Sequence, residues 1–260
     1  MLHLKKHNSF PKTNTDKYYI ILDYMKTFIH LKGLYTKEER SIIRSIIQQD
    51  IPERDFVAKI GSNAMICNDY FIGHKLNSEV SGFIQYDSII KKNSHENILI
   101  MPYCPKGSMR DYDWNENNMD VFKSCLKQLF FSLLIAFQTF GFIHSNIHLG
   151  NVLMVETDRL LIEYDDIDIP LHGYTIAISD FEYSINELSI KQTVLFYREI
   201  AHILEDITYN LRLEFDGMAN LHKEVIDNCY KNTDISDFID IINSVDNLQP
   251  SKSKFSVCFV

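Results

Sequence analysis

The chain has 260 residues, of which 45% are hydrophobic and 23% charged, and it contains only 9 glycines and 6 prolines. This composition excludes a disordered, collagen-like or low-complexity protein. The formal net charge is −9 and no basic tract stands out, which disfavours a protein that binds nucleic acid. We therefore expect a globular protein made of one large domain or two small lobes.

The five cysteines are odd in number, and no two have the spacing of a zinc ribbon or a disulfide framework. This usage favours a reducing environment, so we expect an intracellular, cytoplasmic protein. The N-terminal ten residues lack the apolar core of a signal peptide. The most apolar stretch, residues 129–143, is too short to cross a bilayer, and we expect no membrane association.

The first half of the chain predicts helices and strands in mixed order. Helical patterns cover residues 16–31, 37–50 and 77–92. A short β-rich run covers residues 55–60, and a buried strand covers residues 98–103, with Pro102 at its end. A turn at residues 105–108 follows this strand.

The second half is mostly helical. Its longest helical pattern runs from Asn118 to Phe140 and is closed by Gly141. Short strands are expected over residues 151–154, 159–163 and 174–179, and helices over 194–207 and 235–245. The order predicts an α+β fold with two lobes and a hinge near residues 101–107.

One loop and one later carboxylate carry the residues that suggest chemistry. The polar loop from His144 to Asn151 follows the longest helix and leads into an apolar strand, and Asp180 comes 29 residues after Asn151. The amide oxygen of Asn151 and the carboxylate of Asp180 are hard ligands of the kind that Mg²⁺ prefers, with nucleotide phosphates completing its shell. The alternative is structural: a turn amide and a carboxylate that caps a helix.

These residues resemble two motifs of the protein-kinase-like superfamily. The catalytic loop of that family reads H-x-D-x-x-x-x-N, and here it reads His144 to Asn151 with Asn146 at the aspartate position. The metal-binding motif D-F-G of the family corresponds to Asp180-Phe181-Glu182. The resemblance covers residues 55 to 207 and implies a single kinase-like domain over residues 1–260. Its small N-lobe (1–103) has a helical N-terminal extension, and its helical C-lobe (104–260) is shortened.

Two details of the motifs are similar to atypical branches of the superfamily. The inner His148-x-Gly150-Asn151 is similar to the loop of haspin-like and aminoglycoside-phosphotransferase-like kinases. The run Asp180-Phe-Glu-Tyr-Ser resembles the matching segment of choline kinases.

Further matches lie upstream of the loop. Lys59, in Val57-Ala58-Lys59, stands where the family has its β3 lysine, and Glu79, 20 residues later, stands where it has the αC glutamate. The resemblance implies that this ion pair holds the α- and β-phosphates of ATP, with Asn151 and Asp180 as the Mg²⁺ ligands. The alternative for both is structural, with Lys59 a surface lysine and Glu79 an exposed helix residue.

The segment after the predicted strand resembles the kinase hinge. It comprises Met101 to Met109, and the backbone of Met101, Tyr103 and Cys104 is expected to contact the adenine ring. ATP and Mg²⁺ are therefore the implied cofactors.

Several departures from the family pattern affect the expected activity. Asn146 is not a base at neutral pH, and loss of general-base assistance commonly costs ~10²–10⁴-fold in rate. Glu182 replaces the glycine of D-F-G and adds a negative charge near the metal. No G-x-G-x-x-G lies upstream of Lys59, and no A-P-E follows Asp180.

Three functions follow as hypotheses. The first is a pseudokinase that binds ATP and Mg²⁺ and acts through a protein partner. The second is an active atypical kinase that phosphorylates Ser/Thr residues or a small alcohol. The third is a non-kinase interaction domain with accidental motif matches, which a small sheet without a Lys59–Glu79 contact would favour.

The abundance of Ile, Asn, Lys and Tyr is typical of an AT-rich genome. Together with the degenerate kinase motifs, it resembles kinase-like proteins of large DNA viruses. A viral source would imply host or viral protein partners, in the host cytoplasm or the virion.

Overall fold

The computed structural model describes residues 56–164, 167–186, 192–211, 215–231 and 235–251. The helices expected over residues 16–31 and 37–50 lie outside this part of the chain. The described residues form two compact units. The first unit holds residues 56–105 and 179–184, and the second holds the remainder.

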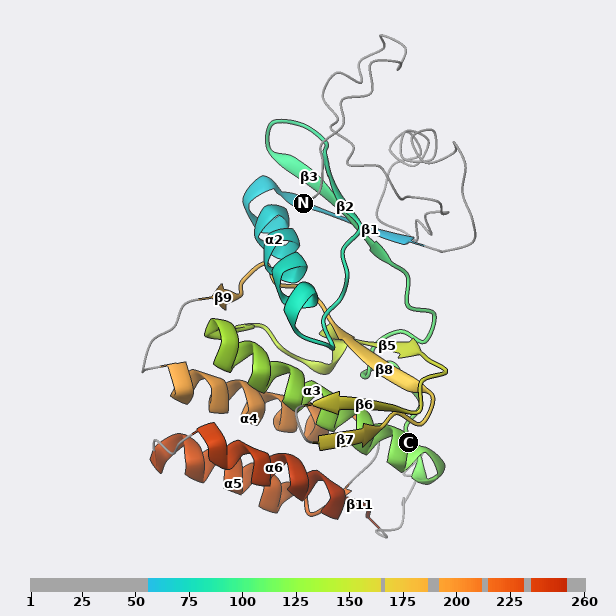
Figure 1. The fold of residues 1–260 in the computed structure, drawn as a ribbon, viewed down its shortest axis with the longest axis vertical. Coiled ribbons are helices and arrows are strands. Elements are labelled where there is room, and N and C mark those ends of the chain that lie inside the picture. The colour runs from blue at the N-terminus through green and yellow to red at the C-terminus, as the bar shows by residue number, and fades with distance from the viewer. Residues whose placement is uncertain (1–55, 165–166, 187–191, 212–214, 232–234, 252–260) are drawn as a thin grey trace, which may run out of the picture. The chain divides into compact units, whose positions relative to one another are not determined.

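The first unit is built on a three-stranded antiparallel sheet (Figure 1). Its strands are β1 (Phe56–Ser62), β2 (Ser88–Lys91) and β3 (Glu96–Pro102), in the order β1-β3-β2. Lys59 pairs with Leu99 and Val57 with Met101 in the β1–β3 register. Apolar residues make up more than half of β1 and of β3, as strand formation favours. The strands predicted at 55–60 and 98–103 are confirmed.

Helix α2 (Asn63–Glu79) follows β1 without a connecting loop. Ser62 ends the strand and caps the helix, since its side chain accepts a hydrogen bond from the N–H of Met65 at 3.4 Å. Ile66, Tyr70 and Leu76 are buried along one side of α2, which lies beside the sheet (Figure 1). This direct entry places the first turns of α2 close to Lys59 in sequence.

The helix predicted over residues 77–92 is wrong. Only residues 77–79 are helical, Gly82 adopts a φ of 89° in the turn that follows, and residues 88–91 form β2. The helical stripe was suggested by four apolar residues, and all of them are buried: Val80, Phe83, Ile84 and Ile90. They belong, however, to the connection after α2 and to strand β2. A short apolar run of this kind fits either period.

The second unit is dominated by helices that run alongside one another (Figure 1). They are α3 (Met119–Phe140), α4 (Gln192–Asn210), α5 (Met218–Lys231) and α6 (Phe238–Ser244). Gly141 ends α3 with a left-handed φ of 64°, and its N–H donates to the carbonyl oxygens of Ala136 and Phe137, as a C-capping glycine does. The core includes tilted and edge-on contacts among the rings of Phe130, Phe196, Tyr197 and Phe238.

The described residues of the second unit also form four short antiparallel strand pairs. They are β4 (Phe142–Ile143) with β9 (Ile185–Asn186), β5 (Val152–Glu156) with β8 (Tyr174–Ile178), β6 (Leu161–Tyr164) with β7 (Ile167–Pro170), and β10 (Phe215–Asp216) with β11 (Gln249–Pro250). Small sheets and separate helices make this an α+β fold, as predicted. The two-lobed kinase arrangement and the boundaries 1–103 and 104–260 stay predictions. Among the described helices, none has the length and apolarity needed to cross a membrane.

Candidate functional site

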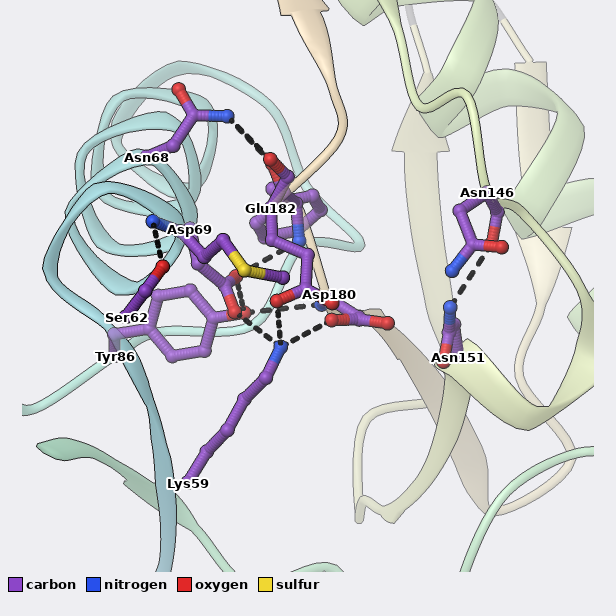
Figure 2. Close-up of polar contacts among 11 residues, drawn as sticks. Lys59, Ser62, Asn68, Asp69, Tyr86, Asn146, Asn151, Asp180 and Glu182 are labelled. Atoms are coloured by element: carbon purple, nitrogen blue, oxygen red, sulfur yellow. Dashed lines mark hydrogen bonds and ion pairs between the residues drawn. The ribbon is translucent and has the colours of Figure 1, made fainter. Parts of the chain in front are cut away.

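Lys59 on β1 is the centre of a charged cluster in the first unit (Figure 2). Its Nζ lies 2.9 Å from Asp69 Oδ2 and 3.5 Å from Glu182 Oε2, and it also donates a hydrogen bond to Asp180. Burial by itself would lower the pKa of Lys59, but the charges and hydrogen bonds of Asp69 and Asp180 outweigh it and hold that pKa above its ordinary value. The lysine is therefore a permanent cation that faces three carboxylates.

Asp69 on α2 connects this lysine to the rest of the unit. It is fully buried, and its Oδ2 accepts from Lys59 while its Oδ1 accepts from the Tyr86 hydroxyl and from the N–H of Phe181 at 2.9 Å. A buried carboxylate is tolerated only when it is paired and hydrogen-bonded, and these three donors meet that need.

The expected pairing of Lys59 with Glu79 is wrong. Lys59 pairs with Asp69 instead, and Glu79 is an exposed residue at the far end of α2. Ten residues separate the two acids, which is about 15 Å along a helix. The family spacing of 20 residues does not apply here because α2 begins directly after β1.

The missing Lys59–Glu79 contact is the observation that favours the non-kinase hypothesis. Lys59 nevertheless pairs with a carboxylate of helix α2, which also carries Glu79, because Asp69 takes the place expected for that glutamate. Asp69 was not singled out from the sequence. Asp69 lies on the same side of α2 as the buried Ile66 and Gly73. This helical spacing is the pattern from which it could have been predicted.

The backbone of the segment Asp180-Phe181-Glu182 is hydrogen-bonded to side chains of α2. Asn68 Nδ2 donates to the carbonyl oxygens of Phe181 and Glu182, each at 3.1 Å, and the Phe181 N–H donates to Asp69 (Figure 2). Asp180 adopts a φ of 75°, a left-handed conformation that is uncommon for a residue with a side chain. The surrounding hydrogen bonds hold this segment with the Asp180 carboxylate beside Lys59.

The three hinge residues lie at the end of the sheet. Met101 belongs to β3 and pairs with Val57, and Tyr103 and Cys104 follow the strand. All three are partly buried, and burial raises the pKa of the Cys104 thiol to about 11, so it stays a thiol at neutral pH. Their contact with an adenine ring stays a prediction.

In the second unit, Asn146 and Asn151 lie in one loop. Asn151 Nδ2 donates to the carbonyl oxygen of Asn146 at 3.1 Å (Figure 2), and the side chain of Asn151 is buried in a short 3₁₀ turn, Leu149–Asn151. The Oδ1 of this amide is the atom with metal-ligand chemistry. Asn146 is only partly buried.

Two acids of α4 hold this loop in place, and the sequence alone did not reveal them. Glu199 accepts hydrogen bonds from the N–H groups of His144, at 3.0 Å, and Ser145. Asp206 accepts from the N–H of Leu149 at 2.7 Å and from Arg110 at 3.0 Å. The two acids are seven residues apart, two turns on one helix face, and this spacing is the signal that could have found them.

Glu199 should make folding stability depend on pH. Burial raises its pKa from 4.5 to about 7, although the two backbone N–H groups act in the opposite direction. The folded protein therefore holds a proton that the unfolded chain releases. This contribution to stability is complete below the unfolded pKa and is lost as the pH rises through about 7.

The matching measurement compares the wild type with Glu199→Gln, which does not titrate. We expect the unfolding free energy of the wild type, relative to that variant, to fall by about 3 kcal/mol between pH 4.5 and 8. Urea denaturation at several pH values measures this difference. A difference that stays constant across the range would contradict the buried, proton-binding carboxyl.

The donor set of the first unit suits a magnesium–nucleotide complex. Asp180 offers a partly exposed carboxylate, the kind of oxygen ligand that Mg²⁺ takes, and Lys59 offers a partly exposed cation to phosphate oxygens. Both groups are oriented by the buried side of α2 through Asp69.

Comparison with known proteins gives limited support to this chemistry. No family model matches the chain. A probable serine/threonine-protein kinase of Dictyostelium discoideum is 30% identical over 119 residues, which is 44% of this chain and 10% of that protein. The match indicates a kinase-like relationship. The closer resemblance to haspin-like, aminoglycoside or choline kinases and the viral source stay predictions.

Proposed function

We propose that the chain is a kinase-like protein that binds ATP with Mg²⁺ and transfers phosphate very slowly or not at all, as a pseudokinase. The observation that carries the proposal is the buried Asp69 beneath Lys59, with Asp180 at the same ammonium group. A lysine, an acid on the next helix and a metal-binding aspartate are the parts with which kinases hold the phosphates. The similarity to a probable Ser/Thr kinase agrees with it.

Each proposed role follows from the chemistry of one group. Lys59 would hold the α- and β-phosphates, and Asp180 would supply a carboxylate ligand to Mg²⁺. Asn151 is assigned the second Mg²⁺ position by its motif. The backbone of the hinge residues, Met101, Tyr103 and Cys104, is assigned the adenine ring.

Asn146 limits the proposed activity. Its side chain cannot take the proton of a substrate hydroxyl at neutral pH, so the chain lacks the base that most kinases place there. A protein with a nucleotide site and no base acts through what it binds, and we propose a protein partner within the cell. An active kinase with a Ser/Thr or small-alcohol substrate is the alternative outcome of the transfer experiment described in the Discussion.

A thermal-shift experiment tests the nucleotide site. At ATP concentrations tenfold above Kd, with Mg²⁺ present, we expect the Tm of the wild type to rise by about 3 °C. Lys59→Ala and Asp180→Ala should each lose this rise. The matched control is Lys91→Ala, an exposed lysine of the same sheet, which should keep it. An unchanged wild-type Tm would overturn the proposal.

A further inference from the structure

A tyrosine hydroxyl stands between the two acids of the candidate site. The Tyr86 hydroxyl donates to Asp69 Oδ1 at 2.5 Å and accepts from the backbone N–H of Asp180 at 3.1 Å (Figure 2). One oxygen atom thus joins helix α2 to the residue that is proposed to bind the metal. Tyr86 belongs to the connection between α2 and β2, and no motif pointed to it.

The ring of Tyr86 cannot easily leave this position. It is buried and packs edge-on against Phe181, with 5.9 Å between ring centroids. Gly73 on α2 makes room for both rings, since a Cβ at this position would lie 2.5 Å from Tyr86 Cε2 and 2.8 Å from Phe181 Cε2. A glycine in the middle of a helix lowers helix stability by roughly 1 kcal/mol relative to alanine. The close packing of the two rings explains why this position nevertheless holds glycine.

The hydroxyl also keeps its proton. Burial, together with the negative charge of Asp69, raises the pKa of Tyr86 well above its ordinary value. Tyr86 is therefore protonated at neutral pH and donates to Asp69, while its oxygen accepts from the Asp180 N–H.

We propose that Tyr86 is a positioning residue for metal binding: its hydroxyl fixes the backbone of Asp180 against Asp69, so that the Asp180 carboxylate is presented to Mg²⁺. The proposal rests on the proposed nucleotide function. Asp180 has a positive φ, an uncommon backbone conformation for a residue with a side chain, and the hydrogen bond from its N–H to the Tyr86 hydroxyl helps to hold it there. The hydroxyl acts on the backbone of Asp180 and does not itself touch the metal or the nucleotide.

This role predicts a loss that is specific to the metal. Without the hydroxyl, the Asp180 N–H loses this hydrogen bond and Asp69 loses one donor, while Lys59 keeps its bond to Asp69. The phosphate contact through Lys59 should then survive, and the contribution of Mg²⁺ to nucleotide affinity should fall.

Tyr86→Phe tests the proposal, because it removes the hydroxyl and keeps the packed ring. The matched control is Tyr70→Phe on α2, which is equally buried and whose hydroxyl has no hydrogen-bond partner among the described residues. Calorimetric titration with ATP, with Mg²⁺ and with EDTA, gives for each protein the factor by which Mg²⁺ tightens binding. We expect this factor to fall about tenfold in Tyr86→Phe and to stay unchanged in Tyr70→Phe.

The outcomes separate the two proposals. Wild type that binds no ATP overturns the proposed function and this inference with it. Wild type that binds ATP with Mg²⁺, beside a Tyr86→Phe protein with the same Mg²⁺ factor, overturns only the role of Tyr86. An equal weakening with Mg²⁺ and with EDTA also overturns it, because it would show a general structural role.

Discussion

Asp69→Asn is expected to lower the unfolding free energy by about 3 kcal/mol and to weaken ATP binding more than tenfold. The carboxylate is fully buried and accepts from Lys59, the Tyr86 hydroxyl and the Phe181 N–H. An asparagine must turn its NH₂ group toward at least one of these donors. Lys59 also loses the charge that balances it, and a buried ion pair that loses one partner is strongly destabilising.

Glu79→Gln is the matched control, since it makes the same chemical change on the same helix. Glu79 is exposed at the C-terminal end of α2. We therefore expect the unfolding free energy of the Glu79→Gln protein to differ from that of the wild type by less than about 0.5 kcal/mol. Urea denaturation and ATP titration of the two variants measure both effects. If Glu79→Gln lost as much as Asp69→Asn, the assignment of Asp69 as the partner of Lys59 would be wrong.

Asn146→Asp is expected to raise the rate of γ-phosphate transfer by about 10²-fold or more. Phosphoryl transfer depends mainly on positioning and on neutralised charge, and the proposed nucleotide site would supply both. Restoring the aspartate then adds the group that accepts the substrate proton. Autophosphorylation and release of labelled phosphate from γ-³²P-ATP report the rate.

The control for this gain is the double variant Asn146→Asp with Asp180→Ala, which should be inactive because it lacks the proposed metal ligand. No gain in the single variant would contradict the assignment of Asn146 to the catalytic position. Rapid transfer by the wild type that Asp180→Ala abolishes would replace the pseudokinase by the active-kinase alternative.

Long and strongly patterned elements were predictable from the sequence. The helix from Met119 to Phe140 has an apolar side and a glycine C-cap, and the strands of the first unit are β-rich runs. Helix α2 was missed because its apolar residues are spread around the helix and it contains Gly73, so the helical period of its sequence is weak. Its role became visible only through the side chains packed on it.

Part of the site was predictable because it lies in short motifs. Lys59 and Asp180 were identified by their neighbours in sequence, and the structure brings them together. Asp69, the acid that pairs with Lys59, was not identified from the sequence. The expected spacing placed the next helix well after β1, whereas α2 begins directly after that strand. Tyr86 and Glu199 act through buried hydrogen bonds to backbone N–H groups, and such contacts leave no local pattern in the sequence.

Calorimetric titration of the wild type and of Asp180→Asn with ATP and Mg²⁺ tests the central claim most directly. The proposed site predicts one bound nucleotide per wild-type chain and at least about tenfold weaker binding by the variant, because a neutral amide is a poorer ligand for Mg²⁺ than a carboxylate. A wild type that binds no nucleotide, or a variant that binds as tightly as the wild type, would contradict the claim.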